Sequence, residues 1–379
     1  MNKILTITPS LYGGAGNFIT SLLCFTQNIG YKNTLISSRL KNQYIDWTNY
    51  IDILKKEGVK NLQLDFFHRE SSIFWINCEK LVDIIKTNDF SLIHTHSALP
   101  TLAARIALEI TKKTIPILTT FYSFGLDRPK WMDFEDYYSF DKADRITTIS
   151  NYCKDLLFKN GIPESKIELI PIGIDIDEIE ANKGNRHKTR SKISVSDKDI
   201  LLIQVAAIEP RKNQTMSLKI LECLKGEKDR KYKLILVGDK KDDFYFQEMK
   251  NYIEKKNLWD DVIFTGLVDN SYKYLFASDI FIFPTLSEGL GLAILEAMAA
   301  KIPVFSTYIE GTKDILIDEV NSKVISIDNP MEAADSILDL LKSRDTIDKF
   351  CTNAYNIVHD KFVISRTLQR YMQIYMELI

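Results

Sequence analysis

Short hydrophobic runs alternate with longer amphipathic segments along the whole chain. In the first half the runs lie at 3–8, 33–37, 92–96, 115–121, 145–150 and 167–172. In the second half they lie at 200–208, 233–238, 262–265, 279–284, 303–306 and 323–327. Such runs predict buried strands, and the segments between them, with apolar residues three and four positions apart, predict helices. Two series of strand-and-helix units predict an α/β protein with two parallel sheets, each covered by helices on both faces.

Length and composition narrow the class of protein. A chain of 379 residues is long for a single hydrophobic core and favours two domains. Its 49 basic and 51 acidic residues nearly cancel, which argues against general nucleic-acid binding and against strong charge-driven attachment to an anionic membrane. The five cysteines lie far apart without a Cys-x-x-Cys pair, so we expect reduced thiols.

The N-terminal sequence and the hydropathy of the chain bear on its location. Residues 1–8 have the pattern of a first strand and lack the features of a signal peptide. Arg105 and Glu109 interrupt the best candidate for a run of about 18 apolar residues. We therefore expect a cytoplasmic protein, with membrane contact at most peripheral and at the inner face.

The most informative stretch is 284–300, in which Glu288 and Glu296 bracket a glycine-rich turn and the start of an apolar helix. The glycines let the backbone turn sharply and approach a ligand. The helix is expected to begin near Leu292, so its free N–H groups and positive dipole end face the turn and suit an anionic or hydroxyl-rich ligand. Glu288 would precede this helix and Glu296 would lie about one turn inside it. Taken alone, the two acids could also be a capping residue and a surface residue.

Arg211 and Lys212 follow the first strand of the second series. Ligands of open parallel sheets bind at the carboxyl ends of strands, where two adjacent cations would neutralise a diphosphate. If a sugar is transferred from a nucleotide, the diphosphate is the leaving group and gains negative charge in the transition state. Fixed cations would stabilise that charge. A solvated turn is the alternative interpretation of this pair.

Three features of the first half are less specific. The glycine-rich turn at 13–16 lacks the Gly-x-Gly-x-x-Gly pattern of dinucleotide sites and could reflect close packing of strand and helix. His94 and His96 are expected to face opposite ways on one strand, so that only His96, at the strand end, faces a ligand. The aromatic residues of 121–140 either stack on sugars or pack a loop onto the sheet. Three charged residues there are candidates for contact with an acceptor: Asp127, Arg128 and Lys130.

The stretch 284–300 resembles the signature of the family-4 retaining glycosyltransferases, usually Pro-Ser-x-x-Glu-Gly-Phe-Gly-x-x-x-x-Glu-Ala-Met-Ala. The resemblance covers nearly the full chain, with further matches at 13–15, 93–97, 143–145, 171–175, 209–213, 237–238 and 264–266. It implies the GT-B architecture, in which two doubly wound Rossmann-like domains face each other across a cleft and the last helix returns to the first domain. The acceptor-side domain would comprise 1–172 plus 361–379, and the nucleotide-sugar-binding domain 173–360.

The resemblance also implies a role for each matched residue. Arg211 and Lys212 would hold the diphosphate, and Glu296 the ribose. Glu288 would bind hydroxyls of the donor sugar near the reacting carbon. Further donor contacts, largely through the main chain, are implied for Gly14, Gly16, Gly266, Val268, Gly289, Leu290, Gly291 and Leu292. An Asp-x-Asp pattern at 175–177 lies in the matched interdomain loop, so no metal site is expected there.

Some positions depart from the family pattern. Tyr122 stands where many members have a histidine, so it can donate a hydrogen bond but carries no positive charge at neutral pH. Together with His96 it forms the candidate acceptor side. Ala206 and Ala207 replace a Gly-Arg pair of many members, and Ile172 replaces an asparagine.

The implied function is metal-independent, retaining transfer of a hexose-type sugar from a UDP- or GDP-sugar to a glycan, lipid-linked or small-molecule acceptor, in cell-surface polysaccharide or glycoconjugate biosynthesis. No cofactor and no nucleic-acid partner are implied. Two alternatives stay open. One is a nucleotide-sugar 2-epimerase of the same fold, for which no acid–base set at the sugar C2 is evident. The other is a non-catalytic partner of a related transferase, which would tolerate loss of the donor site.

Overall fold

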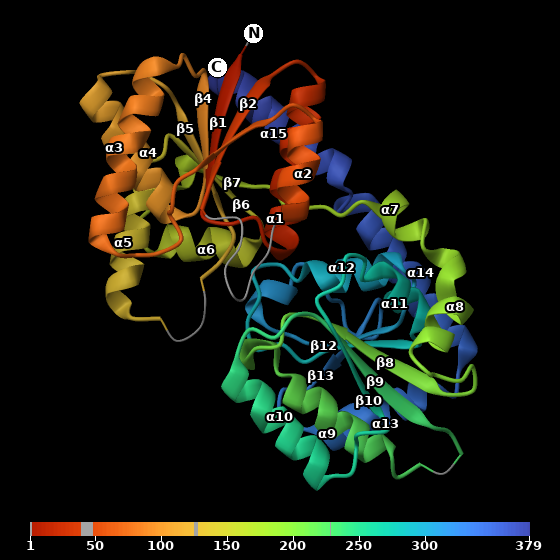
Figure 1. The fold of residues 1–379 in the computed structure, drawn as a ribbon. Coiled ribbons are helices and arrows are strands. Elements are labelled where there is room, and N and C mark those ends of the chain that lie inside the picture. The colour runs from red at the N-terminus through yellow and green to blue at the C-terminus, as the bar shows by residue number, and fades with distance from the viewer. Residues whose placement is uncertain (1, 39–47, 125–127, 228) are drawn as a thin grey trace. The chain divides into compact units, whose positions relative to one another are not determined.

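The structure, a computed structural model, describes four stretches of the chain: 2–38, 48–124, 128–227 and 229–379. The chain forms two α/β units (Figure 1). The first comprises Met1–Ile172 and Ser365–Ile379, and the second comprises Gly173–Ile364. The chain thus leaves the first unit after residue 172 and returns to it at residue 365, four residues beyond the position expected from the sequence.

The sheet of the first unit is parallel throughout, in the order β3-β2-β1-β4-β5-β6-β7. Its strands are β1 (Lys3–Thr8), β2 (Lys32–Ser37), β3 (Lys60–Gln63), β4 (Leu92–His96), β5 (Ile117–Phe121), β6 (Arg145–Thr148) and β7 (Ile167–Leu169). Its helices are α1 (Gly13–Asn28), α2 (Thr48–Lys56), α3 (Ser71–Thr87), α4 (Ala98–Thr111), α5 (Lys130–Asp141), α6 (Asn151–Lys159), η1 (Glu164–Lys166) and α15 (Ile364–Leu378). Figure 1 shows α3, α4 and α5 on one face of this sheet and α1 and α2 on the other.

The second sheet is also parallel, in the order β10-β9-β8-β11-β12-β13. Its strands are β8 (Ile200–Val205), β9 (Tyr232–Val237), β10 (Val262–Gly266), β11 (Ile280–Phe283), β12 (Val304–Thr307) and β13 (Lys323–Ile325). Its helices are α7 (Ile176–Glu180), η2 (Lys183–Asn185), α8 (Arg186–Lys192), η3 (Pro210–Lys212), α9 (Gln214–Leu224), α10 (Asp243–Lys255), α11 (Tyr272–Ala277), α12 (Leu292–Ala299), η4 (Glu310–Thr312), α13 (Pro330–Leu340) and α14 (Arg344–Lys361). The predicted fold class, two doubly wound Rossmann-like domains, is confirmed.

The hydrophobic runs predict every described strand except β3. Strands β4, β5 and β11 are buried along their whole length, because helices cover both faces of a parallel sheet. β11 is apolar throughout, whereas β4 and β5 begin with apolar residues and also carry buried His and Thr side chains. β3 lies at an edge, and three of its four residues are polar. An edge strand of this kind has no hydrophobic signature that could distinguish it from a loop.

The last helix, α15, packs into the first unit through two fully buried tyrosines. The hydroxyl of Tyr375 lies 2.7 Å from Nδ1 of His94. The hydroxyl of Tyr371 lies 2.9 Å from Oγ1 of Thr147 and 3.1 Å from Oγ1 of Thr120. Buried polar groups need hydrogen-bond partners, and α15 adds two tyrosine hydroxyls to a polar layer in which Thr120 also bonds to His94 and Thr147.

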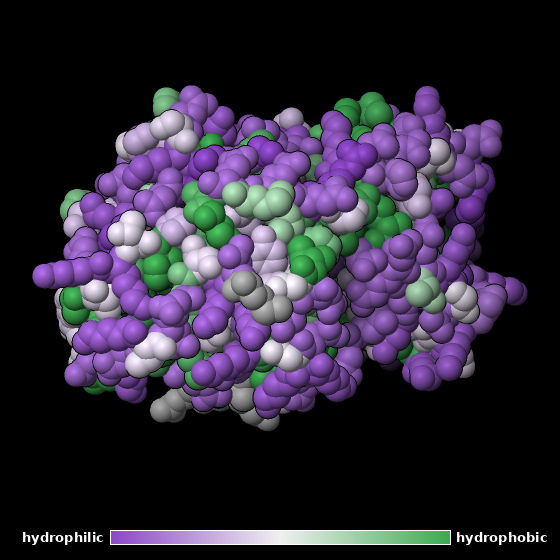
Figure 2. All heavy atoms as spheres, turned by 90° about the horizontal axis from the view of Figure 1, so that it is seen from above, coloured by the Kyte–Doolittle hydropathy of each residue, from purple (hydrophilic) through white to green (hydrophobic). Residues whose placement is uncertain are grey.

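The surface is mostly polar. Figure 2 shows one face on which hydrophilic residues predominate and hydrophobic ones form small groups. Exposed aromatic residues include Trp131, Phe134 and Tyr138 on α5, whereas Phe121 at the start of the same aromatic stretch is buried. Burial of Phe121 agrees with packing onto the sheet, whereas the exposed rings on α5 are free of such packing and stay candidates for stacking on sugars. No helix in the described stretches has the length and apolarity needed to cross a membrane, and all five cysteines are free thiols.

Candidate active site

The carboxyl ends of β8 and β11 lie side by side where the strand order of the second sheet reverses. This switch point is where doubly wound sheets bind their ligands. The loop after β8 contains η3, and the loop after β11 contains the glycine-rich turn. The backbone N–H of Leu286 donates to the carbonyl of Arg211 at 2.8 Å, so the two loops are joined directly. The topology therefore brings both predicted donor-binding segments into one site.

Glu288 lies against both predicted diphosphate ligands. Its Oε1 pairs with Nζ of Lys212 and accepts a hydrogen bond from Oγ1 of Thr285 at 2.9 Å. Its Oε2 lies 3.7 Å from Nη1 of Arg211. Glu288 is only 8% exposed, and a carboxylate buried to this extent needs such partners because an isolated buried charge is costly. The carboxylate predicted to bind sugar thus neutralises the cations predicted to bind diphosphate.

Lys212 is itself nearly buried, with a side chain 12% exposed. Burial lowers the pKa of Lys212; the carboxylate of Glu288 opposes this effect and the guanidinium of Arg211 adds to it. The second cation, Arg211, is held by the carbonyl of Ser287 at 2.9 Å and by the carboxylate of Glu209 at 2.6 Å. Both cations are therefore fixed by several partners before any ligand is considered.

The turn 289–291 ends where α12 begins, at Leu292 as predicted. Gly291 has a φ of +91°, a conformation that favours glycine. The first N–H groups of α12 lack partners within the helix and border this turn. On its other side the turn is closed by η4, where Gly311 packs so closely that a Cβ would lie 1.9 Å from the carbonyl oxygen of Glu288. Nothing in the sequence marked Gly311 as part of the site.

Glu296 lies one turn inside α12, which packs against α7. Burial, together with the smaller effect of the Glu178 carboxylate on α7, raises the pKa of Glu296 to about 7. The pKa of Glu178 is also raised, mainly by burial and to a smaller extent by the negative charge of the nearby Asp175. Oδ1 of Asp175 accepts a hydrogen bond from the N–H of Glu178 at 3.0 Å, so the first acid of the Asp-x-Asp pattern caps α7.

The predicted base-binding residues lie at the carboxyl end of β10. Gly266, with a φ of +65°, ends this strand, and Val268 is in the loop that follows. The strand β9 separates β10 from β8, so these residues form a part of the edge distinct from Lys212. The N–H of Gly238 donates to the carbonyl of Gly266 at 3.2 Å, and a Cβ on Gly238 would lie 2.0 Å from the carbonyl oxygen of Ala206. The ends of all three strands are thus closely joined.

In the first unit, the rings of His94 and His96 lie on the same face of β4, with centroids 4.2 Å apart. The expectation that they face opposite ways is wrong, because strand residues two apart share a face. His94 bonds to Tyr375 on α15 and to Thr120 on β5, while Nδ1 of His96 lies 2.7 Å from the hydroxyl of Tyr122. Burial lowers the pKa of His96 to about 3 and that of His94 well below its usual value, so both rings are neutral near pH 7.

The structure brings His96 and Tyr122 together at the carboxyl ends of the adjacent strands β4 and β5. Nε2 of His96 is buried and has no hydrogen-bond partner among the residues that the structure describes. Ser97 follows His96 and has a φ of +104°, and Ser123 follows Tyr122 and has a φ of +152°. Such strain in residues other than glycine concentrates at functional sites, and sequence analysis did not single out these serines.

The remaining candidates of the first unit have structural partners. Gly16 packs so closely on the preceding loop that a Cβ would lie 2.6 Å from the carbonyl carbon of Leu11, which accounts for a glycine there. Gly14 lies in the first turn of α1. Donor contact by either glycine stays a prediction.

Of the three charged acceptor candidates, Asp127 lies outside the described residues. The guanidinium of Arg128 pairs with Asp136 at 2.6 Å and with Asp133 at 2.9 Å, and it lies 4.2 Å from the centroid of the Phe124 ring. These contacts fix Arg128 within the first unit. Lys130 is the first residue of α5.

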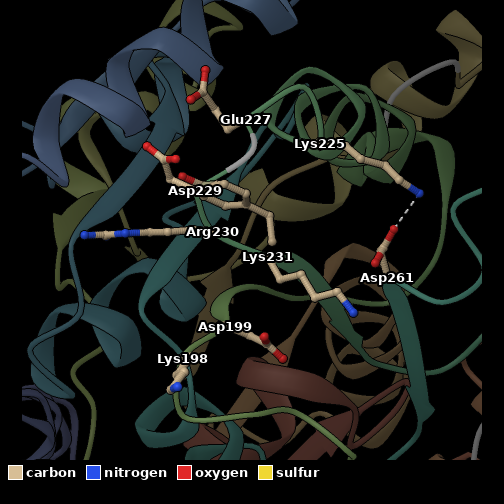
Figure 3. Close-up of a pocket in the computed structure, with 9 residues that line it drawn as sticks. Lys198, Asp199, Lys225, Glu227, Asp229, Arg230, Lys231 and Asp261 are labelled. Carbon is tan, nitrogen blue, oxygen red and sulfur yellow. Dashed lines mark ion pairs between the residues drawn. The ribbon is translucent and has the colours of Figure 1, made fainter.

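A hollow of about 440 Å³ lies at the opposite end of the second sheet (Figure 3). Its lining includes Asp199, Tyr232 and Asp261, at the amino ends of β8, β9 and β10. It carries charges of both signs, and Lys225 pairs with Asp261 at 2.7 Å. Because doubly wound sheets bind ligands at the carboxyl ends of their strands, this hollow is not the predicted donor site. No group of three or more metal-ligating side chains occurs in the described part of the chain.

Comparisons with known proteins bear on the whole chain. The family model "Glycosyltransferase Family 4" matches residues 12–178, and "Glycosyl transferases group 1" matches residues 185–357. N-acetyl-alpha-D-glucosaminyl L-malate synthase of Bacillus anthracis is 21% identical over 304 residues, covering 79% of this chain and 78% of that protein. Alpha-monoglucosyldiacylglycerol synthase of Streptococcus pneumoniae is 27% identical over 284 residues, covering 70% of this chain but 60% of that protein.

Solved structures share the fold over the full length. Anabaena Alr3699/HepE in complex with UDP and glucose has a TM-score of 0.84 at 17% identity, covering 100% of both chains. A protein from Rickettsia africae ESF-5, whose structure is titled as that of a glycosyltransferase, has a TM-score of 0.84 at 21% identity, covering 100% of this chain and 98% of that one.

Proposed function

The chain belongs to the family-4 glycosyltransferases, since two adjoining family models together span nearly all of it, and from this premise we propose that it is a metal-independent, retaining hexosyltransferase. The donor is a UDP- or GDP-sugar. The acceptor is a glycan, a lipid-linked sugar or a small molecule. The product belongs to cell-surface polysaccharide or glycoconjugate biosynthesis, on the cytoplasmic side of the membrane.

The observation that carries this proposal is the cluster of Arg211, Lys212 and Glu288 at the switch point of the second sheet. Two fixed cations beside the N-terminus of α12 form a site for a diphosphate. A diphosphate would compete with Glu288 for Lys212. We propose that donor binding exchanges these partners: the phosphates take the cations, and the released carboxylate accepts hydrogen bonds from the sugar hydroxyls.

The proposed reaction follows from this exchange. The bond between the sugar C1 and the β-phosphate oxygen breaks, and the acceptor oxygen bonds to C1 on the same face of the ring. The acceptor proton passes to the departing phosphate oxygen. Negative charge grows on the diphosphate as the bond breaks, and Arg211, Lys212 and the amides of α12 stabilise it, so charge stabilisation by a metal is not required in this scheme.

The nucleoside would lie along the same sheet edge. Glu296 would hold the ribose hydroxyls, and the chain from Gly266 to Val268 would contact the base. The Anabaena neighbour was crystallised with UDP, which supports a uridine nucleotide as the first donor class to test. The acceptor side would include the neutral pair His96 and Tyr122. The unpartnered Nε2 of His96 and the hydroxyl of Tyr122 can both bind sugar hydroxyls.

The acceptor class is left open because the relatives differ. The names of two of them specify an L-malate and a diacylglycerol product. A third, from Escherichia coli and 23% identical over 310 residues, is named for a sugar on diphosphoundecaprenol. These three names correspond to small-molecule, lipid and lipid-linked acceptors.

A thermal-shift screen with UDP, GDP, ADP and their sugars tests the donor proposal. A specific ligand raises the melting temperature in proportion to RT ln(1 + [L]/Kd), so the correct base should give the largest shift. Calorimetry then measures the affinity, and slow donor hydrolysis reports transfer to water. Failure to bind any nucleoside diphosphate would refute the proposal. Isomerisation of the donor sugar without an acceptor would instead indicate a 2-epimerase, and binding without any turnover across an acceptor panel would favour a non-catalytic partner.

A further inference from the structure

The backbone turn that carries the two cations is held from two sides. The carbonyl of Arg211 accepts hydrogen bonds from the N–H of Leu286 at 2.8 Å and from Oγ1 of Thr285 at 3.2 Å. The carbonyl of Lys212 accepts a hydrogen bond from Nε2 of Gln204 at 2.7 Å. The first set of bonds joins two loops. The second connects the turn to β8 of the sheet and, among the described residues, is the one side-chain hydrogen bond to the carbonyl of Lys212.

Gln204 is an unusual residue for its place in the fold. It lies in β8, between β9 and β11, and is 1% exposed. Its neighbours Leu202 and Ile203 are fully buried and apolar, as expected for a central parallel strand. A buried amide is costly unless both of its ends are paired. Here its Oε1 accepts from Oγ of Ser217 at 2.7 Å, and its Nε2 donates to Lys212, so both ends have partners.

Ser217 holds the other end of this amide. It is fully buried in α9, and its hydroxyl donates to Gln204. The carbonyl of Lys212 can only accept, so the amide nitrogen faces the turn and the amide oxygen faces the hydroxyl of Ser217. The residue after Lys212, Asn213, has a φ of +52°, at the point where the chain reverses into α9. The position of Nζ of Lys212 depends on a turn that this chain of two hydrogen bonds holds against the sheet.

We propose that Gln204 is a positioning residue for Lys212, and that Ser217 orients its amide. This inference rests on the proposed donor site, because Lys212 matters to function only if it binds the diphosphate. Gln204 does not touch the donor. It fixes the position of the Lys212 turn relative to the carboxyl end of β8. The ammonium group is then already placed for the phosphate, and binding does not have to order the turn.

A double-mutant cycle tests this role. The affinity for UDP and for GDP is measured by calorimetry in Lys212→Ala, Gln204→Leu and the double variant. Gln204→Leu is expected to weaken nucleotide binding about tenfold, the size of effect expected when a buried partner is removed. In the Lys212→Ala background the same change should alter affinity less than about twofold, because the group it positions is gone. Equal effects in the two backgrounds would mean a general structural role and would overturn the proposal.

Gln214→Leu is the matched control. Gln214 is equally buried, at 1% exposed, and its Nε2 donates to the carbonyl of Ala207 at 2.8 Å and not to the carbonyl of Lys212. Its effect on nucleotide affinity should be the same with and without Lys212→Ala. A coupling as large as that of Gln204 would overturn the specific role of Gln204.

Ser217→Ala is the milder variant if Gln204→Leu does not fold. It should weaken binding in the same direction, and by less, and it should have no further effect once Lys212 is alanine. Unchanged affinity in Ser217→Ala would refute the orienting role. If the wild-type protein binds neither nucleotide, the proposed function and this inference fail together. If it binds, and Lys212→Ala weakens binding while Gln204→Leu and Ser217→Ala do not, only the positioning role fails.

Discussion

Replacing Gly311 with alanine tests how the Glu288 loop is held. A Cβ at this position would lie 1.9 Å from the carbonyl oxygen and 2.5 Å from the carbonyl carbon of Glu288. The two segments would have to move apart by about 1.5 Å or more to reach an ordinary van der Waals contact. Neither side is free to do so, because Oγ1 of Thr312 anchors η4 to the carbonyl of Thr307 at 3.0 Å, and Oγ1 of Thr307 donates to the carbonyl of Thr285 at 2.5 Å.

Two effects of Gly311→Ala are expected from this geometry. Overpacking of a closed site costs about 1–3 kcal/mol of stability. A displacement of about 1 Å at a group that contacts substrate can lower the rate about 100-fold. Because Glu288 is the proposed sugar ligand, kcat should fall much more than the affinity for free UDP or GDP.

The assay combines thermal or urea unfolding with steady-state kinetics and nucleotide calorimetry. Gly184→Ala is the matched control, since a Cβ at Gly184 would meet nothing within 4 Å. It should leave stability and turnover close to those of the wild-type protein. Wild-type stability in Gly311→Ala would refute the packing argument, and lowered stability with unchanged kcat would refute the claim that this contact positions Glu288.

Other predictions concern the charges and the buried tyrosine. Lys212→Ala should weaken UDP or GDP binding about 10- to 100-fold by calorimetry, since one charge-assisted contact contributes roughly 1.5–3 kcal/mol; unchanged affinity would contradict its role. Glu288→Ala should lower kcat more than nucleotide affinity, whereas Glu296→Ala should weaken the free nucleotide; the opposite pattern would exchange the two roles. Burial and Glu178 raise the pKa of Glu296 to about 7 from a usual value of 4.5, so the stability that this carboxyl contributes is complete below pH 4.5 and is lost as the pH rises through 7. Glu296→Gln should remove that loss, and equal pH slopes in urea unfolding of both proteins would refute it. Tyr371→Phe should cost about 1–3 kcal/mol of unfolding free energy, because it leaves two buried threonine hydroxyls with one partner fewer; an unchanged urea midpoint would argue against that polar layer.

The residues of the candidate donor site could be proposed from the sequence because they are local to motifs, and the structure brings the two motifs together. Glu288 and Glu296 occur in one continuous stretch, and Arg211 and Lys212 follow a recognisable strand, so strand order alone brings the two loops together. Residues that support the site from a distance escaped prediction. Gly311 has no motif around it in the sequence, and its contact with Glu288 is evident only in the structure. It follows β12, whereas Glu288 follows β11.

The error at His94 and His96 has a different origin. The residues were placed on the correct strand, but strand geometry puts side chains two residues apart on one face, and the structure has both rings buried there. Their neutral state also depends on burial, which spacing along the chain does not report. The consequence for the candidate site is that His96 acts as a hydrogen-bonding group and not as a cation.

Local patterns in the sequence are enough to predict the class of fold and to propose a donor-binding motif. Alternation of apolar runs and amphipathic segments specifies parallel sheets covered by helices, because only a strand buried on both faces is apolar along its whole length. Charge and glycine content predict an anion site at a helix start. These are local properties, readable within a few residues.

The partner of each polar group depends on the tertiary fold. The ion pair of Lys212 with Glu288, the amide of Gln204 beneath the turn and the tyrosine Tyr375 bonded to His94 all join segments far apart in the chain. A buried polar side chain must find a partner, but its identity follows from how strands and helices pack, and no spacing in the sequence encodes that choice.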